Sequence, residues 1–383
     1  MHTKDKESIH IEDMLSGHLS AQLVLFLILY GITGAAAFIA ALYLLLRRGN
    51  AFAADVTPPL PLRRWAASFF AVSALGHVWW GVFYLLSVQH LSSDDLFCSV
   101  GYVAIVMLDC VTLLTTIAGT LLAMLQDRKR PVWPVFAAMT PFVAMGGVLM
   151  VRPSHQLMLT VIAYILLLYV AFAIYVAFAV KQYGRWLRDN FADLQRKEVW
   201  LSQALSLVFM LLFILYALVD SNIVLIYLLH FLELVLYGFL LWRVETLPQL
   251  DDCSLAPEPS PKQENQGEVP FSIEQLLAEH CVATQLYLQH DLTLMQLAKA
   301  LGTNRTYLSQ YFVDKGINYN TYINDLRISH FVSRYSEAQR NGRSVTAQKL
   351  AQESGYRSYS TFSLAFKQRM GQSVTAWMRK VSQ

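Results

Sequence analysis

The chain has 383 residues, of which 55% are hydrophobic and only 15% are charged, and its formal net charge is +3. Because soluble proteins carry about 25% charged residues, this composition argues against one large soluble fold. The four cysteines are scattered, without a CxxC pair or a His/Cys spacing for zinc. Neither a disulfide framework nor a zinc finger is indicated, and we expect no metal and no cofactor.

Apolar residues are concentrated between residues 19 and 242, in seven stretches that are each long enough to cross a bilayer. Only two stretches contain a charged residue, Asp109 in the third and Glu233 in the seventh. Soluble cores rarely need seven such stretches in series, so we predict an all-α bundle of seven transmembrane helices over 19–242. The expected spans are Leu19–Leu46, Trp65–Leu86, Leu96–Leu125, Pro131–Val151, Leu157–Val180, Leu201–Val219 and Ile223–Trp242.

The basic residues of the connecting segments predict the orientation of this bundle. The segments after spans one to six contain 4, 0, 3, 1, 5 and 0 Lys or Arg residues. Basic residues accumulate in cytoplasmic loops, so the odd-numbered segments are expected in the cytoplasm. Residues 1–18 have mixed charge and precede an apolar run that is too long for a signal-peptide core. We therefore expect an extracytoplasmic tail at 1–18 and a C-terminal half in the cytoplasm.

The longest internal loop, residues 181–200, places Trp186, Leu187, Phe191 and Leu194 on one helical face among basic residues. This pattern is typical of a helix that lies on a membrane surface, and equally of an extension of span five. Both alternatives remain open from the sequence.

Composition changes after Trp242. Five prolines and many polar residues fall between Glu245 and Pro270, which predicts an extended, flexible linker over 243–270. A flexible tether transmits little torque. We therefore expect a signal to change the association of membrane domains, or to release the downstream module from the cytoplasmic face of the membrane domain.

From residue 271 onward the apolar periodicity predicts two helix-turn-helix motifs, over 292–312 and 345–377. A longer helix is expected between them, from Tyr319 to about Ala338. Capping residues set the helix bounds. The expected N-caps are Ser272, Thr293, Asn304, Thr346 and Ser358, and the expected helix ends are Gly302, Gly355 and Gly371.

Basic residues are in excess in this half. Residues 284–383 contain 13 Lys and Arg against 5 Asp and Glu, a net charge of +8. A basic excess in one compact module, together with two helix-turn-helix motifs, is typical of proteins that bind the phosphate backbone of DNA. On the second helix of the first motif, Tyr307, Leu308 and Phe312 are expected to face inward.

The two motifs and the helix between them carry a recognisable set of residues. They are Leu294, Leu297, Ala298, Leu301, Gly302, Tyr307, Leu308 and Phe312 in the first motif, Tyr322, Ile323, Leu326, Arg327 and Ile328 on the connecting helix, and Ala351, Gly355, Tyr356, Ser358, Ser360, Phe362, Phe366, Lys367, Gly371 and Ser373 in the second. Through them, residues 271–380 of the domain expected at 271–383 resemble the DNA-binding domain of the AraC family of bacterial transcription regulators. Leu364 departs from the family, which often has Arg or Lys there. Val374 replaces the usual Pro, and Trp377 the usual Tyr.

This resemblance implies two helix-turn-helix subdomains that read two successive major grooves of double-stranded DNA. Arg305 and Gln310 have the donor geometry for guanine and adenine edges, while Lys367 and Arg369 suit phosphate. The expected DNA-binding residues are Asn304, Arg305, Thr306, Ser309, Gln310, Arg357, Tyr359, Ser360, Thr361, Ser363, Lys367 and Arg369.

Four polar residues fall within the predicted spans: His77, Asp109, His230 and Glu233. Polar groups are costly in lipid and usually face a bundle interior or a cavity. A ligand-binding site, a proton-sensing pair and structural hydrogen bonds between helices are all open alternatives. No nucleotide loop, kinase signature or catalytic triad is recognised, so no enzyme activity is expected.

Together these patterns predict a one-component regulator in the bacterial cytoplasmic membrane, with its N-terminus outside and its DNA-binding domain in the cytoplasm. The expected partners are double-stranded DNA, the lipid bilayer and an unidentified signal ligand or membrane partner, with a homodimer as an open alternative. A second hypothesis is a transporter-like protein whose attached DNA-binding domain reports substrate occupancy. A third is a passive membrane anchor.

Overall fold

The computed structural model describes most of the chain as helix. The described residues contain no β-strand, so the predicted all-α fold is confirmed. The chain divides into two compact units, the first formed by residues up to 179 and 199–250, the second by 180–198 and 251–383. The described residues are 21–47, 49–90, 95–194, 196–216, 223–250 and 272–381.

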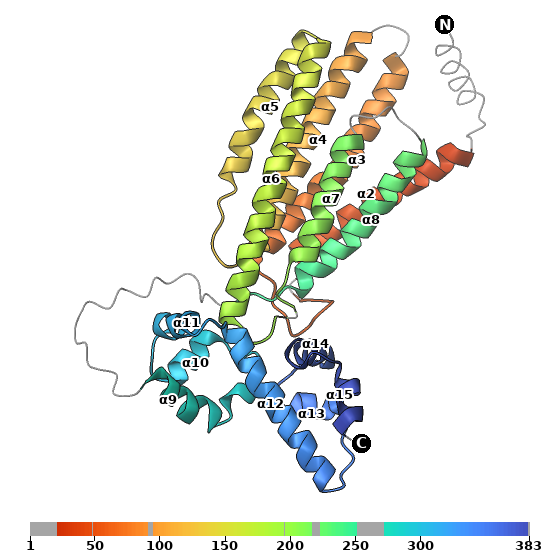
Figure 1. The fold of residues 1–383 in the computed structure, drawn as a ribbon. Coiled ribbons are helices and arrows are strands. Elements are labelled where there is room, and N and C mark those ends of the chain that lie inside the picture. The colour runs from red at the N-terminus through yellow and green to blue at the C-terminus, as the bar shows by residue number, and fades with distance from the viewer. Residues whose placement is uncertain are drawn as a thin grey trace, which may run out of the picture. The chain divides into compact units, whose positions relative to one another are not determined.

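The first unit is a bundle of long apolar helices (Figure 1). In it α2 packs against α3 and α8, while α4 packs against α3, α5 and α7. The helices are α2 (Ala21–Leu46), α3 (Leu60–His90), α4 (Asp95–Ala123), α5 (Trp133–Val151), α6 (His155–Asn190, up to residue 179 in this unit), α7 (Trp200–Tyr216) and α8 (Ile223–Thr246).

Six helices of the described residues are long and apolar enough to cross a membrane. The sixth predicted span corresponds to α7, which is apolar but has only 17 described residues. That span was expected to reach Val219, and residues 217–222 lie outside the described residues. Helix α6 continues to Asn190, beyond the predicted end of span five at Val180. The loop after span five therefore begins as an extension of that span.

The predicted linker starts at residue 243, but α8 continues to Thr246. Near its end, the Glu245 carboxylate is buried, lies 3.4 Å from Arg63 Nε and accepts a hydrogen bond from the Tyr43 hydroxyl at 3.1 Å. These partners are distant in sequence, so composition alone could not indicate them. The predicted linker residues 251–270 and the tail 1–18 lie outside the described residues.

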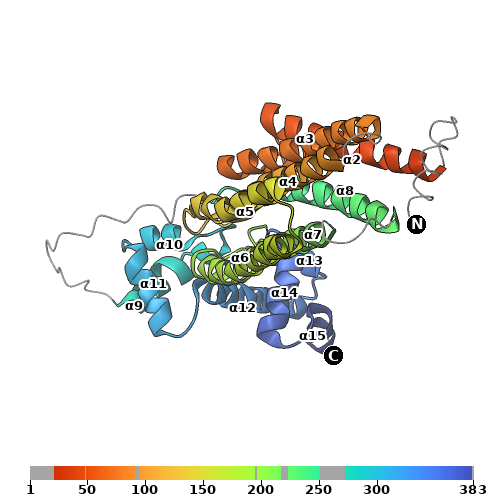
Figure 2. The same ribbon diagram turned by 90° about the horizontal axis from the view of Figure 1, so that it is seen from above.

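The second unit contains two helix-turn-helix motifs joined by the long helix α12. Figures 1 and 2 show α9, α10 and α11 on one side of α12, and α13, α14 and α15 on the other. The helices are α9 (Ile273–Leu277), α10 (Leu294–Ala300), α11 (Arg305–Asp314), α12 (Tyr319–Arg340), α13 (Ala347–Glu353), α14 (Tyr359–Met370) and α15 (Val374–Val381).

The helix bounds of this unit follow the capping residues of the sequence. Each predicted N-cap side chain accepts a backbone N–H from the first turn of its helix, which satisfies a donor that the helix itself cannot. The predicted helix ends Gly302, Gly355 and Gly371 all have positive φ angles, which glycine adopts without steric cost. Local sequence therefore determines where these helices begin and end.

Each motif has a core of its own. The first includes Leu297, Leu308 and Ile323, and the second includes Phe331 and Phe366. The first core also contains Ala192, which comes from the segment after α6. That segment therefore packs as part of the second unit.

The prediction that Tyr307 faces inward is wrong, because its side chain is 66% exposed. Leu308 and Phe312 are buried, and residues four apart share one face of a helix. Tyr307 is turned about 100° from Leu308, so it lies outside that inward stripe.

Arg327 of α12 joins the two motifs. Its side chain is buried, and its guanidinium donates to the carbonyls of Tyr287 and Gln289, both at 2.7 Å. It also lies over the ring of Tyr356 from the second motif, 5.4 Å from the centroid. Burial lowers the pKa of Arg327, but a guanidinium starts so high that it remains charged.

Gly355 leaves room for the Arg327 guanidinium because it has no side chain. Its φ angle is +88°, and a Cβ atom there would lie 2.8 Å from the Leu288 carbonyl oxygen and 2.9 Å from Arg327 Nε. The Gly355 carbonyl oxygen lies 3.0 Å from His290 Nδ1. The junction between the motifs is therefore closely packed.

Candidate nucleic-acid interface

The first recognition helix is α11, and its predicted contact residues run from the N-cap Asn304 to Gln310. None of them is buried. Asn304 also has a local role, because its side-chain oxygen accepts the Tyr307 backbone N–H at 2.9 Å and caps the helix. Gln310 donates to Asp314 at 2.8 Å on the exposed surface. The predicted contact residues of this motif are Asn304, Arg305, Thr306, Ser309 and Gln310.

The second recognition helix is α14, and its predicted contact residues are also outside the core. Ser358 caps the helix, and its hydroxyl lies 3.0 Å from that of Ser360 and 2.9 Å from that of Thr361. These two hydroxyls therefore belong to the capping network as well as to the predicted interface. The predicted contact residues of this motif are Arg357, Tyr359, Ser360, Thr361, Ser363, Lys367 and Arg369.

Two predicted DNA-binding arginines form ion pairs within the unit. Arg357 Nη2 lies 2.9 Å from Asp291, and Arg369 Nε lies 2.9 Å from Asp325. Burial raises the pKa of the Asp325 carboxyl, and the neighbouring Arg369 lowers it in part. Exposed pairs of this kind contribute about 0–1 kcal/mol, so a phosphate can replace the carboxylate at little cost.

Three exposed apolar side chains on these helices lie outside the predicted contact set: Tyr307 and Val313 on α11, and Leu364, which is 62% exposed, on α14. Leu364 occupies the position where the AraC resemblance leads one to expect a basic residue. An exposed apolar side chain on a recognition helix suits contact with a thymine methyl group. Their place just outside the buried stripe was the signal that could have revealed them.

Residues 190–193, here called the docking segment, pack against the first motif within the second unit. Phe191 forms an isolated antiparallel bridge with Thr293, and the Ala192 backbone N–H donates to the Leu292 carbonyl at 3.2 Å. Asn320 of α12 donates to the carbonyls of Ala192 and Phe191, at 2.7 and 3.2 Å. The segment thus binds through main-chain atoms, as an added strand does.

The docking segment also binds a residue that is predicted to read a DNA base. Arg305 Nε donates to Asn190 Oδ1 at 3.0 Å. Nearby, Lys197 lies 3.5 Å from Asp291, the residue that also pairs with Arg357. Arg305 is therefore bound by the last residue of α6, and Asp291, the partner of Arg357, also pairs with Lys197 from the segment after α6.

In the first unit, three of the four predicted intramembrane polar residues lie together. His230 Nδ1 is 3.2 Å from Glu233 Oε2, and His77 Nε2 is 4.0 Å from the same oxygen. Asp109 has different partners, because its two oxygens accept hydrogen bonds from the indole nitrogens of Trp79 and Trp80. The structure thus brings together the histidines and Glu233, while Asp109 is hydrogen-bonded to the tryptophans and interacts with His77 and Glu233 only through its charge.

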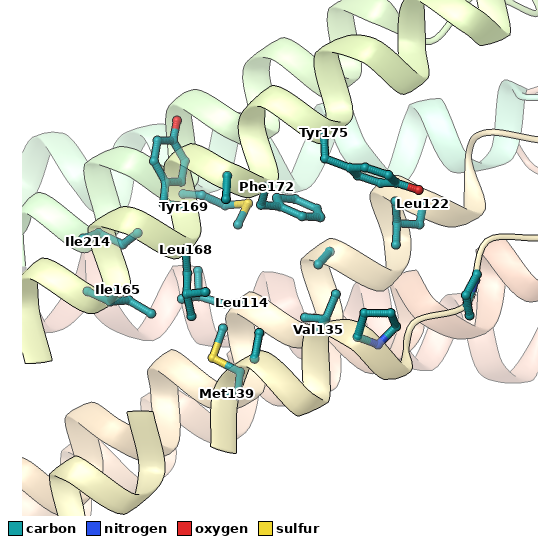
Figure 3. Close-up of a pocket in the computed structure, with 16 residues that line it drawn as sticks. Leu114, Leu122, Val135, Met139, Ile165, Leu168, Tyr169, Phe172, Tyr175 and Ile214 are labelled. Atoms are coloured by element: carbon teal, nitrogen blue, oxygen red, sulfur yellow. The ribbon is translucent and has the colours of Figure 1, made fainter. Parts of the chain in front are cut away.

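A second feature of this unit is an apolar cavity of about 360 Å³ between α4, α5, α6 and α7. Figure 3 shows side chains of these helices pointing into it, among them Leu114, Met139 and Phe172. The Tyr169 hydroxyl beside it donates to the Leu207 carbonyl at 2.9 Å. The lining offers dispersion contacts but no charged group.

Comparison with known proteins identifies one domain. A family model described as a helix-turn-helix domain matches residues 297–380. The match includes both recognition helices, and it supports an AraC-type DNA-binding domain at this place. Neither a curated protein nor a solved structure matches the chain.

Proposed function

We propose that the protein is a membrane-embedded transcription regulator that binds promoter DNA through two helix-turn-helix motifs. The observation that carries the proposal is the match of residues 297–380 to a helix-turn-helix domain. The exposed surfaces of α11 and α14 and the local net charge of +8 support contact with base edges and phosphates. By analogy with the AraC family, the two helices read successive major grooves.

The membrane part of the proposal has its support in the six long apolar helices. The regulator sits in the bacterial cytoplasmic membrane, with the N-terminus outside and the DNA-binding domain in the cytoplasm. The alternating basic residues of the connecting segments support this orientation. The membrane helices receive a signal, so that sensor and DNA-binding domain belong to one chain.

The orientation predicts the activity of reporter fusions. A reporter that works only in the cytoplasm should be active when it is fused after Leu250 and silent when it is fused after Ser92. The reason is that spans alternate in direction, and these points follow spans seven and two. Activity measured in intact cells checks this. Activity after Ser92 and silence after Leu250 would contradict the orientation.

The docking segment supplies a route from the membrane to the DNA-binding domain. While Asn190 holds Arg305, and Phe191 and Ala192 lie across the first motif, Arg305 cannot reach a base edge with the same atom. A signal that withdraws the segment therefore frees the first recognition helix. Regulation would then occur by release of the DNA-binding domain from the docking segment. This mechanism does not require a flexible linker.

Substitution of Asn190 should change DNA binding in two opposite directions. In the full-length chain, Asn190→Ala should raise DNA affinity by about 3–10-fold, since it removes a competing hydrogen bond, and such bonds typically contribute about 0.5–1.5 kcal/mol. Asn190→Asp should lower DNA affinity, because a carboxylate pairs more strongly with the Arg305 guanidinium. Titration of labelled operator DNA with each chain in lipid nanodiscs gives the affinities. Equal affinities for the three chains would refute the docking mechanism.

The DNA-binding function is tested by mapping the genomic fragments that the full-length chain selects. We expect a small set of sites that share two short sequences about one helical turn apart, because α11 and α14 read successive grooves. The chain without residues 272–383 is the control and should select nothing. Uniform recovery of all fragments, or of none, would overturn the proposal.

A further inference from the structure

Three metal-ligand side chains meet inside the membrane bundle: His77 of α3, and His230 and Glu233 of α8. The candidate donor atoms all lie within 4.8 Å of one another. Ligands about 2.0–2.2 Å from a tetrahedral zinc ion are roughly 3.3–3.6 Å apart. The two distances to Glu233 Oε2 are 3.2 Å from His230 and 4.0 Å from His77. Small side-chain rotations therefore suffice to close the three donors around one ion.

Neighbouring groups hold the ligands in the orientation that a metal needs. His77 Nδ1 lies 2.8 Å from the Ser73 carbonyl oxygen, which can only accept, so Nδ1 carries the proton and Nε2 keeps its lone pair. The Tyr237 hydroxyl donates to Glu233 Oε1, which leaves Oε2 for the two histidines. Hydrogen bonds from the far side of a ligand are the usual support of metal sites.

Thr33 of α2 is the remaining polar neighbour of His77. Its hydroxyl lies 2.9 Å from His77 Nε2, but it also lies within hydrogen-bond distance of the carbonyls of Leu29 and Tyr30. A metal on Nε2 would therefore displace Thr33 without leaving its hydroxyl unsatisfied. The apo site can exchange this hydrogen bond for a coordinate bond at low cost.

Aromatic rings enclose the group. Tyr30 lies edge-on to His230 with ring centroids 5.6 Å apart, and Phe26 lies 6.0 Å from the same ring. The side chains of the three ligands are only 11–16% exposed. An apolar shell lowers the local dielectric constant and strengthens the attraction between a divalent cation and a carboxylate.

We propose that His77, His230 and Glu233 bind one divalent first-row transition-metal ion, of the class that includes Zn²⁺. Two imidazoles and one carboxylate are ligands that this class accepts, and a water molecule can fill the fourth position. His77 presents Nε2, and His230 presents Nδ1 in the tautomer that carries its proton on Nε2, so both imidazoles bind as neutral ligands.

The site extends the proposed function, because it identifies the signal as a divalent metal ion. This regulatory role rests on the proposed function. His77 lies toward the Leu86 end of its apolar stretch, and His230 lies close to Ile226. In the proposed orientation both ends are at the outer face. The ion would join α3 to α8, and so it would favour one arrangement of the helices over others.

Zinc binding to the full-length chain tests the site directly. The chain is purified without a polyhistidine tag, stripped with a chelator and placed in lipid nanodiscs. Competition with a fluorescent chelator measures Zn²⁺ affinity, and visible absorption of Co²⁺ reports tetrahedral coordination. We expect one tightly bound ion per chain. Absence of such an ion overturns the proposal.

Variants assign the ion to these residues. His230→Asn should bind Zn²⁺ at least about 100-fold more weakly, and Tyr237→Phe about 10-fold, since loss of a supporting hydrogen bond costs less than loss of a ligand. His155→Asn is the matched control, because His155 is the first residue of α6 and does not belong to the group of three ligands. This variant should bind Zn²⁺ as tightly as the wild type does. Unchanged affinity in His230→Asn overturns the proposal.

Glu233→Gln, which keeps a similar shape, provides a second ligand variant if His230→Asn loses its helical circular dichroism. The same preparations are titrated with operator DNA. Loss of zinc binding with intact DNA binding rejects this site alone, whereas zinc binding without DNA binding rejects the proposed regulator alone.

Discussion

Arg305→Ala should weaken binding to the specific DNA site by about 1–3 kcal/mol, because a base-reading arginine loses its contacts to a guanine edge. The effect is best measured on a soluble fragment of residues 270–383. In the full-length chain, Arg305 also binds Asn190, so its removal has two opposing effects. The fragment lacks Asn190 and isolates the contact with DNA. Fluorescence anisotropy at several salt concentrations gives the affinities.

The control is Arg340→Ala, which removes an exposed arginine at the end of α12. It should change specific binding little and leave the salt dependence nearly unchanged. If Arg305→Ala weakens binding to random DNA as strongly as to the specific site, Arg305 is a phosphate contact and does not read a base. The release mechanism would then act on affinity but not on sequence recognition.

Arg327→Ala should lower the free energy of unfolding of the same fragment by about 3–5 kcal/mol. The substitution leaves the buried carbonyls of Tyr287 and Gln289 without their donors, and each orphaned acceptor costs about 1–3 kcal/mol. It also leaves a cavity beside Tyr356. Urea unfolding followed by circular dichroism measures the change. The fragment contains both cores except Ala192.

Arg334→Ala is the matched control on the same helix. Arg334 is half-exposed and pairs with Glu337 at 3.0 Å, an arrangement worth less than about 1 kcal/mol. Similar losses of stability in the two variants would show that Arg327 does not hold the motifs together. Arg327→Lys should lie between the wild type and Arg327→Ala, because one ammonium group cannot reproduce the planar contacts of a guanidinium.

Much of the fold could be predicted because its signals are local. Runs of apolar residues indicated the long helices, since bilayer thickness sets their length. Residues such as Thr293, Ser358 and Gly371 indicated helix ends, since a cap acts on backbone groups within one turn. The failure at Tyr307 is also local, because aromatic character suggested burial where the helical period placed the side chain outside.

The candidate sites could be predicted only in part. Charge and motif spacing were enough to select α11 and α14 as candidate recognition helices. The free-energy cost of placing polar groups in lipid was enough to select His77, His230 and Glu233 as polar residues of interest. Periodicity paired His230 with Glu233 on one helix face. It could not add His77, because that depends on how α3 packs against α8.

The sequence by itself determined the helices, their caps, the two motifs and the division between an apolar part and a basic helix-turn-helix part, because each depends on residues a few positions apart. Only the tertiary structure decided which distant groups meet. Arg305 and Asn190 are 115 residues apart in sequence, and Tyr43 and Glu245 are 202 apart. Such contacts form because whole apolar faces pack together and bring polar groups within reach, a result that no local pattern encodes.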